Sequence, residues 1–128
     1  MIKKYDSGSS LQEKILKGID TLADNVASTL GPRGRNVILH QKGVNPIITK
    51  DGVTISKFVD LEDPFENAGA QIIKQVAART ADECGDGTTT STVLARAVLR
   101  ESQKYVVAGS SPVEIKRGMD KAVKVIVE

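Results

Sequence analysis

Apolar residues that recur every three or four positions predict an amphipathic helix over residues 10–30, because side chains with this spacing share one helical face. Ser10 and Glu13 have the spacing of a capping box, which predicts where the helix starts. Gly31-Pro32 predicts its end, since glycine accepts a left-handed turn and proline cannot continue the helix. The apolar face is expected to contain Leu11, Ile15, Ile19, Leu22, Val26 and Leu30.

Two short β-prone runs follow, at residues 36–40 and 46–50, and the residues between them favour a small hairpin. His40 ends the first run. It has no second histidine or cysteine nearby, so we interpret it as a structural or solvent-facing residue and not as a metal ligand. The apolar residues of segment 53–59 fit either a strand or a short amphipathic helix, and the pattern alone does not choose.

Three more helices are predicted in the second half of the chain. Asp63-Pro64 and Ser111-Pro112 each provide a capping residue and a proline suited to the first helical position, while Gly109 closes the helix between them. Their expected apolar faces are Phe65, Gly69, Ile72, Val76 and Thr80, then Val93, Leu94, Ala97, Val98 and Tyr105, then Ile115, Met119, Val123 and Ile126.

The fold class expected from these elements is mainly α, with one small β-hairpin. The last apolar pattern runs to Glu128 without a capping residue. We therefore expect the chain to be part of a longer protein, or to be completed by a partner.

Composition and charge narrow the function classes. The chain has 18 Lys and Arg against 16 Asp and Glu, scattered along the sequence, which excludes the concentrated basic patch typical of nucleic-acid-binding proteins. No apolar run reaches membrane-spanning length, and the first residues do not form a secretory signal. The single Cys84 excludes an internal disulfide and is expected to be a small packed residue. We expect a cytoplasmic protein without nucleic-acid or membrane partners.

The segment Gly85–Thr90 carries the most informative chemistry. It places one acid, two glycines and three consecutive hydroxyls directly before a predicted helix, whose first N–H groups are unpaired and attract anions. The glycines leave room for a phosphate beside the backbone, and Asp86 suits a Mg²⁺ ion that bridges phosphates. The alternative, an Asp-Gly turn followed by threonine caps, stays open on composition alone. No Walker A motif occurs in the chain.

Two further turns extend this hypothesis. Thr29–Asn36 combines glycines with cationic side chains and could lay main-chain groups along a nucleotide, although a plain helix stop is the alternative. Asp51 follows the second β-prone run and could orient a water for attack on a terminal phosphoryl group. A solvent-exposed turn acid is the commoner identity for such a residue.

Five segments together resemble, in order and spacing, the start of the group I chaperonins, the bacterial and organellar class. The likeness extends from about Leu11 to the last residue. The matching motifs are Thr29–Asn36, Ile48–Val53, Leu61–Ala70, Ala81–Thr90 and Lys116–Val123.

The resemblance implies that residues 1–128 are the N-terminal portion of an equatorial ATP-binding domain in a subunit of an ATP-driven folding machine. It implies a short helix over 53–59 and a strand at Ile2–Tyr5 beside a neighbouring subunit. It also implies these roles: Thr29, Leu30, Gly31 and Pro32 line the nucleotide; Asp86 holds Mg²⁺; Gly87, Thr88, Thr89 and Thr90 hold phosphates; Lys50 lies beside the phosphates; the carbonyls of Thr29 and Lys50 lie near a bound K⁺; and Asp51 assists hydrolysis.

The same family forms homo-oligomeric rings, works with a co-chaperonin lid and folds unfolded polypeptide clients. Its apical, intermediate and C-terminal equatorial parts have no counterpart in residues 1–128. The second catalytic acid and the base-contacting residues lie in those parts, so we expect the isolated chain to bind ATP weakly and hydrolyse it poorly. The alternative function is a non-enzymatic module that docks onto full-length chaperonin subunits. A small P-loop-like phosphotransferase is disfavoured by the missing Walker lysine.

Overall fold

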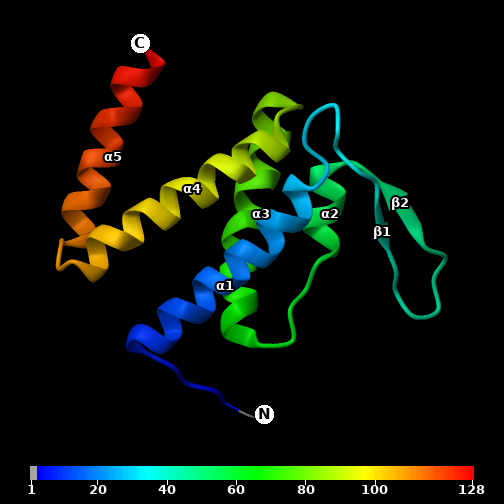
Figure 1. Ribbon diagram of the computed structural model, residues 1–128, viewed down its shortest axis with the longest axis horizontal. Coiled ribbons are helices and arrows are strands. Elements are labelled where there is room, and N and C mark those ends of the chain that lie inside the picture. Colours follow the sequence, from blue (N-terminus) through cyan, green and yellow to red (C-terminus); the bar gives the residue numbers. More distant parts are fainter. Residues whose placement is uncertain (1–2) are drawn as a thin grey trace. The chain divides into compact units, whose positions relative to one another are not determined.

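The computed structural model describes residues 3–128, and these residues form helices and one two-stranded antiparallel sheet (Figure 1). This confirms the mainly α fold with a hairpin. The chain divides into two compact units, one ending at Arg96 and the other starting at Ala97, and each is described by itself. The elements are α1 (Gly8–Ala27), β1 (Val37–Leu39), β2 (Ile47–Thr49), α2 (Gly52–Phe58), α3 (Pro64–Cys84), α4 (Thr88–Val107) and α5 (Pro112–Val127).

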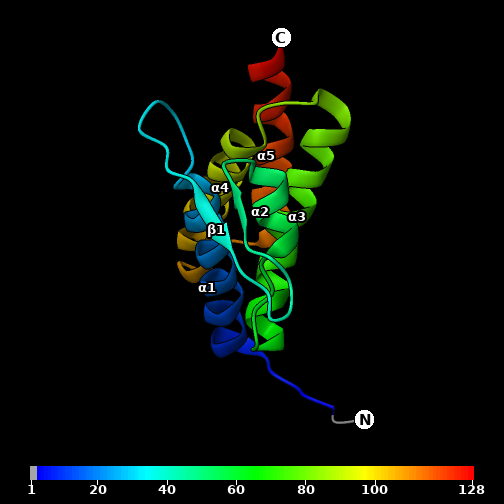
Figure 2. The same ribbon diagram turned by 90° about the vertical axis from the view of Figure 1, so that its right-hand side faces the viewer.

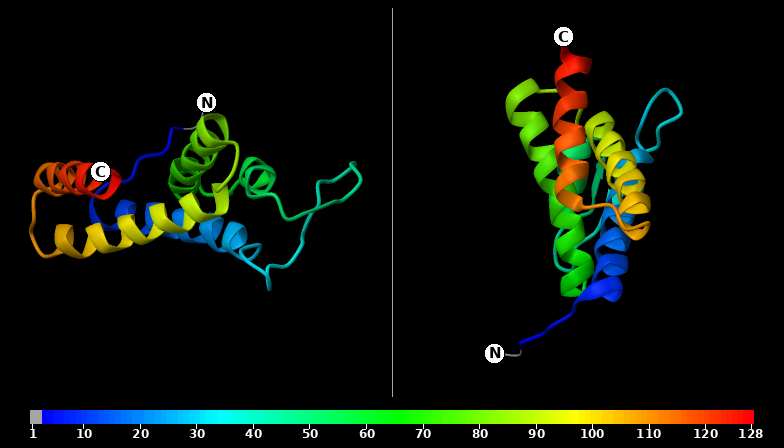
Figure 3. Two further views of the ribbon diagram at one scale, coloured as in Figure 1. Left: turned by 90° about the horizontal axis from the view of Figure 1, so that it is seen from above. Right: turned by 90° about the vertical axis from the view of Figure 1, so that its left-hand side faces the viewer.

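The core of the first unit lies between α1 and α3, which pack along each other (Figures 2 and 3). Two glycines allow this close approach. A Cβ added at Gly18 of α1 would lie 1.7 Å from the Glu66 carbonyl oxygen, and one at Gly69 of α3 would lie 2.0 Å from the Ile15 carbonyl oxygen. Because neither position carries a side chain, the two backbones meet directly. The core side chains around this contact are Ile19, Leu22, Ala23, Val26, Ala70, Ile73 and Ala77, each at most 1% exposed.

The predicted ends of α1 require correction. The helix begins at Gly8, and its start is organised by the Asp6 carboxylate, which accepts from the Ser7 N–H at 2.8 Å and the Ser10 hydroxyl at 3.2 Å. The predicted Ser10–Glu13 capping box is therefore wrong, because Ser10 lies inside the first helical turn. The helix ends at Ala27, so Leu30 lies beyond it and is 48% exposed.

The strand implied at Ile2–Tyr5 falls partly outside the described residues, since Ile2 is not among them. Lys3, Lys4 and Tyr5 have no regular secondary structure.

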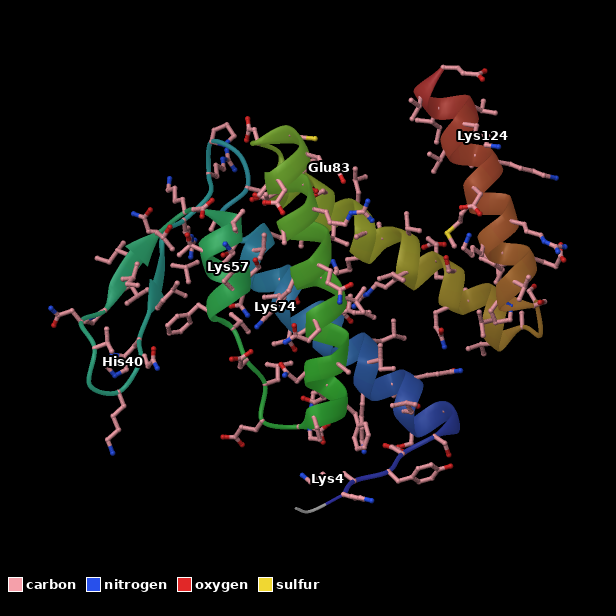
Figure 4. The ribbon with its side chains drawn as sticks, turned by 180° about the vertical axis from the view of Figure 1, so that it is seen from behind. Lys4, His40, Lys57, Lys74, Glu83 and Lys124 are labelled. Atoms are coloured by element: carbon pink, nitrogen blue, oxygen red, sulfur yellow. The ribbon has the colours of Figure 1, made fainter. Side chains whose placement is uncertain are left out.

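The predicted hairpin is confirmed, with Val37 opposite Thr49 and Leu39 opposite Ile47. His40 is exposed at the hairpin, as Figure 4 shows, in line with a solvent-facing residue. The segment that the pattern left open becomes the short helix α2, as the resemblance implied. Asp51 caps this helix by accepting the Thr54 N–H at 2.8 Å.

The start of α3 is confirmed, because the Asp63 carboxylate accepts the N–H groups of Phe65 and Glu66 at 2.8 and 3.0 Å. Its predicted apolar face is partly correct, since Gly69 is buried and Phe65, Val76 and Thr80 are half-buried, whereas Ile72 is 40% exposed. The buried positions are Gly69, Ala70, Ile73 and Ala77. Gly69 lies where the two backbones meet, because a side chain would not fit there.

The end of α4 and the start of α5 match the prediction, but α4 begins at Thr88, so the three threonines expected just before the helix form its first turn. The apolar faces of both helices are largely uncovered in the described residues. Leu94 and Tyr105 of α4 are each 60% exposed, and α5 buries no residue. Thr92 is instead the buried residue of α4. Cys84, expected to be packed, is exposed at the end of α3.

Candidate functional site

A hollow of about 220 Å³ in the first unit brings two of the predicted segments together. One wall follows the end of α1 and the other is the start of α4, two regions that are far apart in the sequence (Figure 1). The lining is mostly polar and belongs to loops and a helix start. The lining residues are Thr29, Leu30, Gly31, Asp86, Gly87, Thr88, Thr89 and Thr90.

The turn before α4 is built by two glycines. Gly85 ends α3 at φ 74°, where its N–H donates to the Ala81 carbonyl at 2.9 Å, and Gly87 has φ 83°. Both angles lie in the left-handed region that glycine adopts without steric cost. Gly87 has no side chain with which to cap α4, and the first residues of that helix line the hollow, where their N–H groups can donate to an anion.

Asp86 projects from this turn and is exposed. One carboxylate oxygen accepts the Gly87 N–H at 2.7 Å, which orients the group without neutralising it. Among the described residues there is no cluster of three or more His, Cys, Asp or Glu suited to a metal ion. A cation at Asp86 would therefore take its other oxygen ligands from a bound anion and from water, which is the usual habit of Mg²⁺.

The opposite wall is a tight turn, and some of its hydrogen-bond donors are already engaged within the turn. The Thr29 hydroxyl is buried and donates to the Val26 carbonyl at 2.7 Å. The backbone N–H of Arg35 donates to the Ser28 carbonyl at 2.9 Å and closes the turn. A Cβ at Gly34 would lie 2.1 Å from the Thr29 carbonyl oxygen, so a glycine is required there. The Thr29 hydroxyl proton is therefore already engaged within the turn.

Asp51 is brought near the start of α4 by its neighbour Gly52. A Cβ at Gly52 would lie 2.9 Å from the Thr89 hydroxyl and 3.2 Å from the Thr88 hydroxyl, so the first residue of α2 touches the first turn of α4. Hydrogen bonds from the Thr54 hydroxyl and N–H lower the pKa of Asp51, which keeps its carboxylate ionised at neutral pH.

Three of the predicted site residues do not line the hollow, namely Pro32, Lys50 and Asp51. Pro32 and Lys50 are exposed, and Asp51 lies at the neighbouring start of α2. Sequence reasoning missed Gly34 and Gly52, whose closeness to Thr29 and to the threonines could be found only in three dimensions. It also missed Thr80 and Ser91, whose hydroxyls lie 2.9 Å apart and link α3 to α4.

None of the helices formed by residues 3–128 combines the length and apolar character that crossing a bilayer requires. Residues 22–128 match the TCP-1/cpn60 chaperonin family. Among solved structures, the chaperonin gp146 from the bacteriophage EL 2 (Pseudomonas aeruginosa), determined in the presence of ATP-BeFx, matches with a TM-score of 0.66 and 36% sequence identity. That match covers 71% of this chain and 16% of the phage chaperonin, so the chain spans a small part of that protein's length. The chain belongs to the TCP-1/cpn60 chaperonin family.

Proposed function

We propose that this chain is the N-terminal equatorial part of an ATP-dependent folding chaperone subunit and that the hollow holds the phosphates and Mg²⁺ of ATP. The observation that carries the proposal is the meeting of the Thr29–Gly31 turn with Asp86 and the uncapped start of α4. That arrangement offers backbone donors to an anion and one carboxylate to a cation. The phage chaperonin solved with ATP-BeFx supports it by likeness.

The size of the hollow supports a site in which residues 3–128 contact only one end of the nucleotide. A volume of about 220 Å³ falls below the roughly 300 to 1,000 Å³ of complete ligand pockets, so it suits the phosphate end alone. The base and the second catalytic acid would then be held by further chain, and residues 3–128 supply one side of the site. Weak binding and poor hydrolysis by the isolated chain follow from this division.

The proposed roles within the chain are as follows. The first N–H groups and hydroxyls of α4 donate to phosphate oxygens, Asp86 offers a carboxylate to Mg²⁺, and Asp51 accepts a hydrogen bond from the attacking water. Thr29–Pro32 lies along the nucleotide, Lys50 lies beside the phosphates, and the carbonyls of Thr29 and Lys50 lie near K⁺. The chain would act in the cytoplasm within a homo-oligomeric ring, with a lid partner and unfolded polypeptide clients.

The proposal is tested by titrating the isotope-labelled chain with ATP and Mg²⁺ while recording amide resonances by NMR. We expect the amides of residues 29–31 and 86–90 to shift, and Asp86→Asn to weaken binding and remove its Mg²⁺ dependence. Asp82→Asn is the matched control, because Asp82 is an exposed acid near the same turn that does not line the hollow. If millimolar ATP leaves those amides unmoved, the proposed site is wrong.

A second candidate function is a module that docks onto full-length chaperonin subunits. It is favoured by the exposed apolar side chains of α5, where Val123 is 57% and Ile126 80% exposed. Size-exclusion chromatography of the chain mixed with a full-length chaperonin checks it. Co-elution that Ile126→Asp abolishes supports docking, whereas separate elution at every ratio contradicts it.

A further inference from the structure

A pair of hydroxyls fixes the first turn of α4 from outside the hollow. Thr80 near the end of α3 and Ser91 in the first turn of α4 place their side-chain oxygens 2.9 Å apart. Thr80 also reaches the Val76 carbonyl at 2.9 Å, and Ser91 reaches the Thr88 carbonyl at 3.0 Å. A row of three close oxygen–oxygen contacts thus runs from the backbone of α3 to the backbone of Thr88, and the central contact joins the two helices.

Two hydroxyl protons can fill two of these three contacts, because the carbonyl oxygens at both ends only accept. The contact between Thr80 and Ser91 is filled when one hydroxyl donates to the other, and is empty when each donates to the carbonyl of its own helix. When Thr80 donates to Ser91, Ser91 donates to the Thr88 carbonyl and so ties the first residue of α4 to α3. Both side chains are half-buried, which makes a hydrogen bond stronger than one exposed to water.

The bridge formed by the two hydroxyls joins the two ends of the turn that carries Asp86. Between Thr80 and Ser91 lie Gly85 and Gly87, both at positive φ, and glycine has a less restricted backbone than any other residue. On its other side α4 touches Gly52 of α2, and farther along Arg96 pairs with Asp24 of α1. The hydroxyl pair is therefore a side-chain link to α3 that helps to set where the donors of Thr88–Thr90 point.

We propose that Thr80 and Ser91 are positioning residues that hold the start of α4 in the orientation that receives phosphate; this inference rests on the proposed function. Neither residue lines the hollow. Their contribution lies in keeping the N–H groups of residues 88–90 aligned before the ligand arrives, because pre-ordered donors spare the ligand the cost of ordering them.

The experiment is a double-mutant cycle on the full 128-residue chain, with Mg·ATP affinity measured by the NMR titration described above. Ser91→Ala and Thr80→Val should each weaken binding roughly three- to tenfold, the equivalent of one net hydrogen bond. The double variant should be no weaker than the single ones, because one bridge is lost in all three. Ser91→Thr and Thr80→Ser keep the hydroxyls and should restore affinity.

Ser102→Ala is the matched control. Ser102 also lies in α4 and donates to a backbone carbonyl of its own helix, Val98, at 2.7 Å, yet it lies outside the hollow. It should leave affinity unchanged. If wild type binds and Ser91→Ala binds equally well, or if the two substitutions add independently, the positioning role is wrong while the nucleotide site stands. If wild type does not bind, both proposals fall.

Discussion

The contact between α1 and α3 makes a strong prediction about two glycines. Substituting Gly18 by alanine puts a Cβ 1.7 Å from the Glu66 carbonyl oxygen, half of the 3.4 Å at which ordinary contact begins. The obstructing atom belongs to the backbone of α3, so no side-chain rotation relieves the clash. Gly69→Ala meets the Ile15 carbonyl oxygen at 2.0 Å in the same way. Each substitution forces the helix pair apart.

The size of the destabilisation follows from the close packing that is lost when the two helices separate. Overpacking a core costs about 1–3 kcal/mol when side chains can adjust, and we expect the upper end, about 3 kcal/mol, where they cannot. The core residues Ile19, Leu22 and Ile73 lie in the same interface and lose close packing together. For a unit of this size that loss lowers Tm by roughly 12 to 24 °C. Total stability of small domains is about 5–15 kcal/mol, so the loss is a large share of it.

The assay is urea unfolding, monitored by circular dichroism. Intrinsic helix propensity acts in the opposite direction, because alanine is better than glycine in a helix by about 1 kcal/mol. Gly118 provides the matched control, since it lies within α5 and a Cβ there meets nothing within 4 Å. Gly118→Ala should leave the free energy of unfolding equal to that of the wild type or raise it. A Gly18→Ala variant as stable as Gly118→Ala would refute the close-contact reasoning.

Three further predictions concern single positions. The buried Thr92 hydroxyl has no hydrogen-bond partner within residues 3–128, so Thr92→Val, which keeps the shape, should raise the free energy of unfolding by about 1 kcal/mol in urea titrations; a loss would show that the hydroxyl is satisfied. Gly52→Ala should cost about 1–3 kcal/mol, measured in the same way, and should shift the Thr88 and Thr89 resonances, because its Cβ would meet both hydroxyls. Backbone hydrogen bonds from Glu66 and Phe65 lower the pKa of Asp63, so its stabilisation is present above its unfolded pKa of about 3.9 and is lost as pH falls through the folded value. The Tm difference between wild type and Asp63→Asn should accordingly shrink below about pH 4, and a difference that stays constant there would contradict this assignment.

Helix positions could be predicted from the sequence because their signals are local. Asp63-Pro64 and Ser111-Pro112 start their helices where the pattern places them, and Gly85 ends α3 in a left-handed turn. The start of α1 was misplaced because two local signals compete. Asp6 precedes the first helical residue, Gly8, whereas Ser10 lies inside the helix, and the negative charge of Asp6 suits the positive end of the helix.

The buried faces could not be predicted so well, because they depend on how near a partner helix comes. On α3 the larger Ile72 and Val76 match the apolar pattern, but the smaller Ala70 and Ala77 face α1. Choosing between them requires knowing that Gly18 permits close approach. The Gly85–Thr90 motif could be recognised from the sequence because its turn and the helix start are contiguous. The roles of Gly52 and Ser91 depend on contacts with residues of other helices, which a local sequence pattern does not reveal.

Asp51 caps α2, and this structural role limits what it can do in ATP hydrolysis. Its carboxylate caps α2 through Thr54, and those hydrogen bonds lower its pKa, so it is a poor acceptor of a proton at neutral pH. It is better suited to orienting a water by accepting its hydrogen bond. Asp51→Asn keeps the cap and removes the charge, so stability should hold, whereas Asp51→Ala should lose about 1 kcal/mol of unfolding free energy. Any ATP hydrolysis by the chain should fall in both variants. If Asp51→Asn hydrolyses ATP like wild type, Asp51 is a helix cap and nothing more.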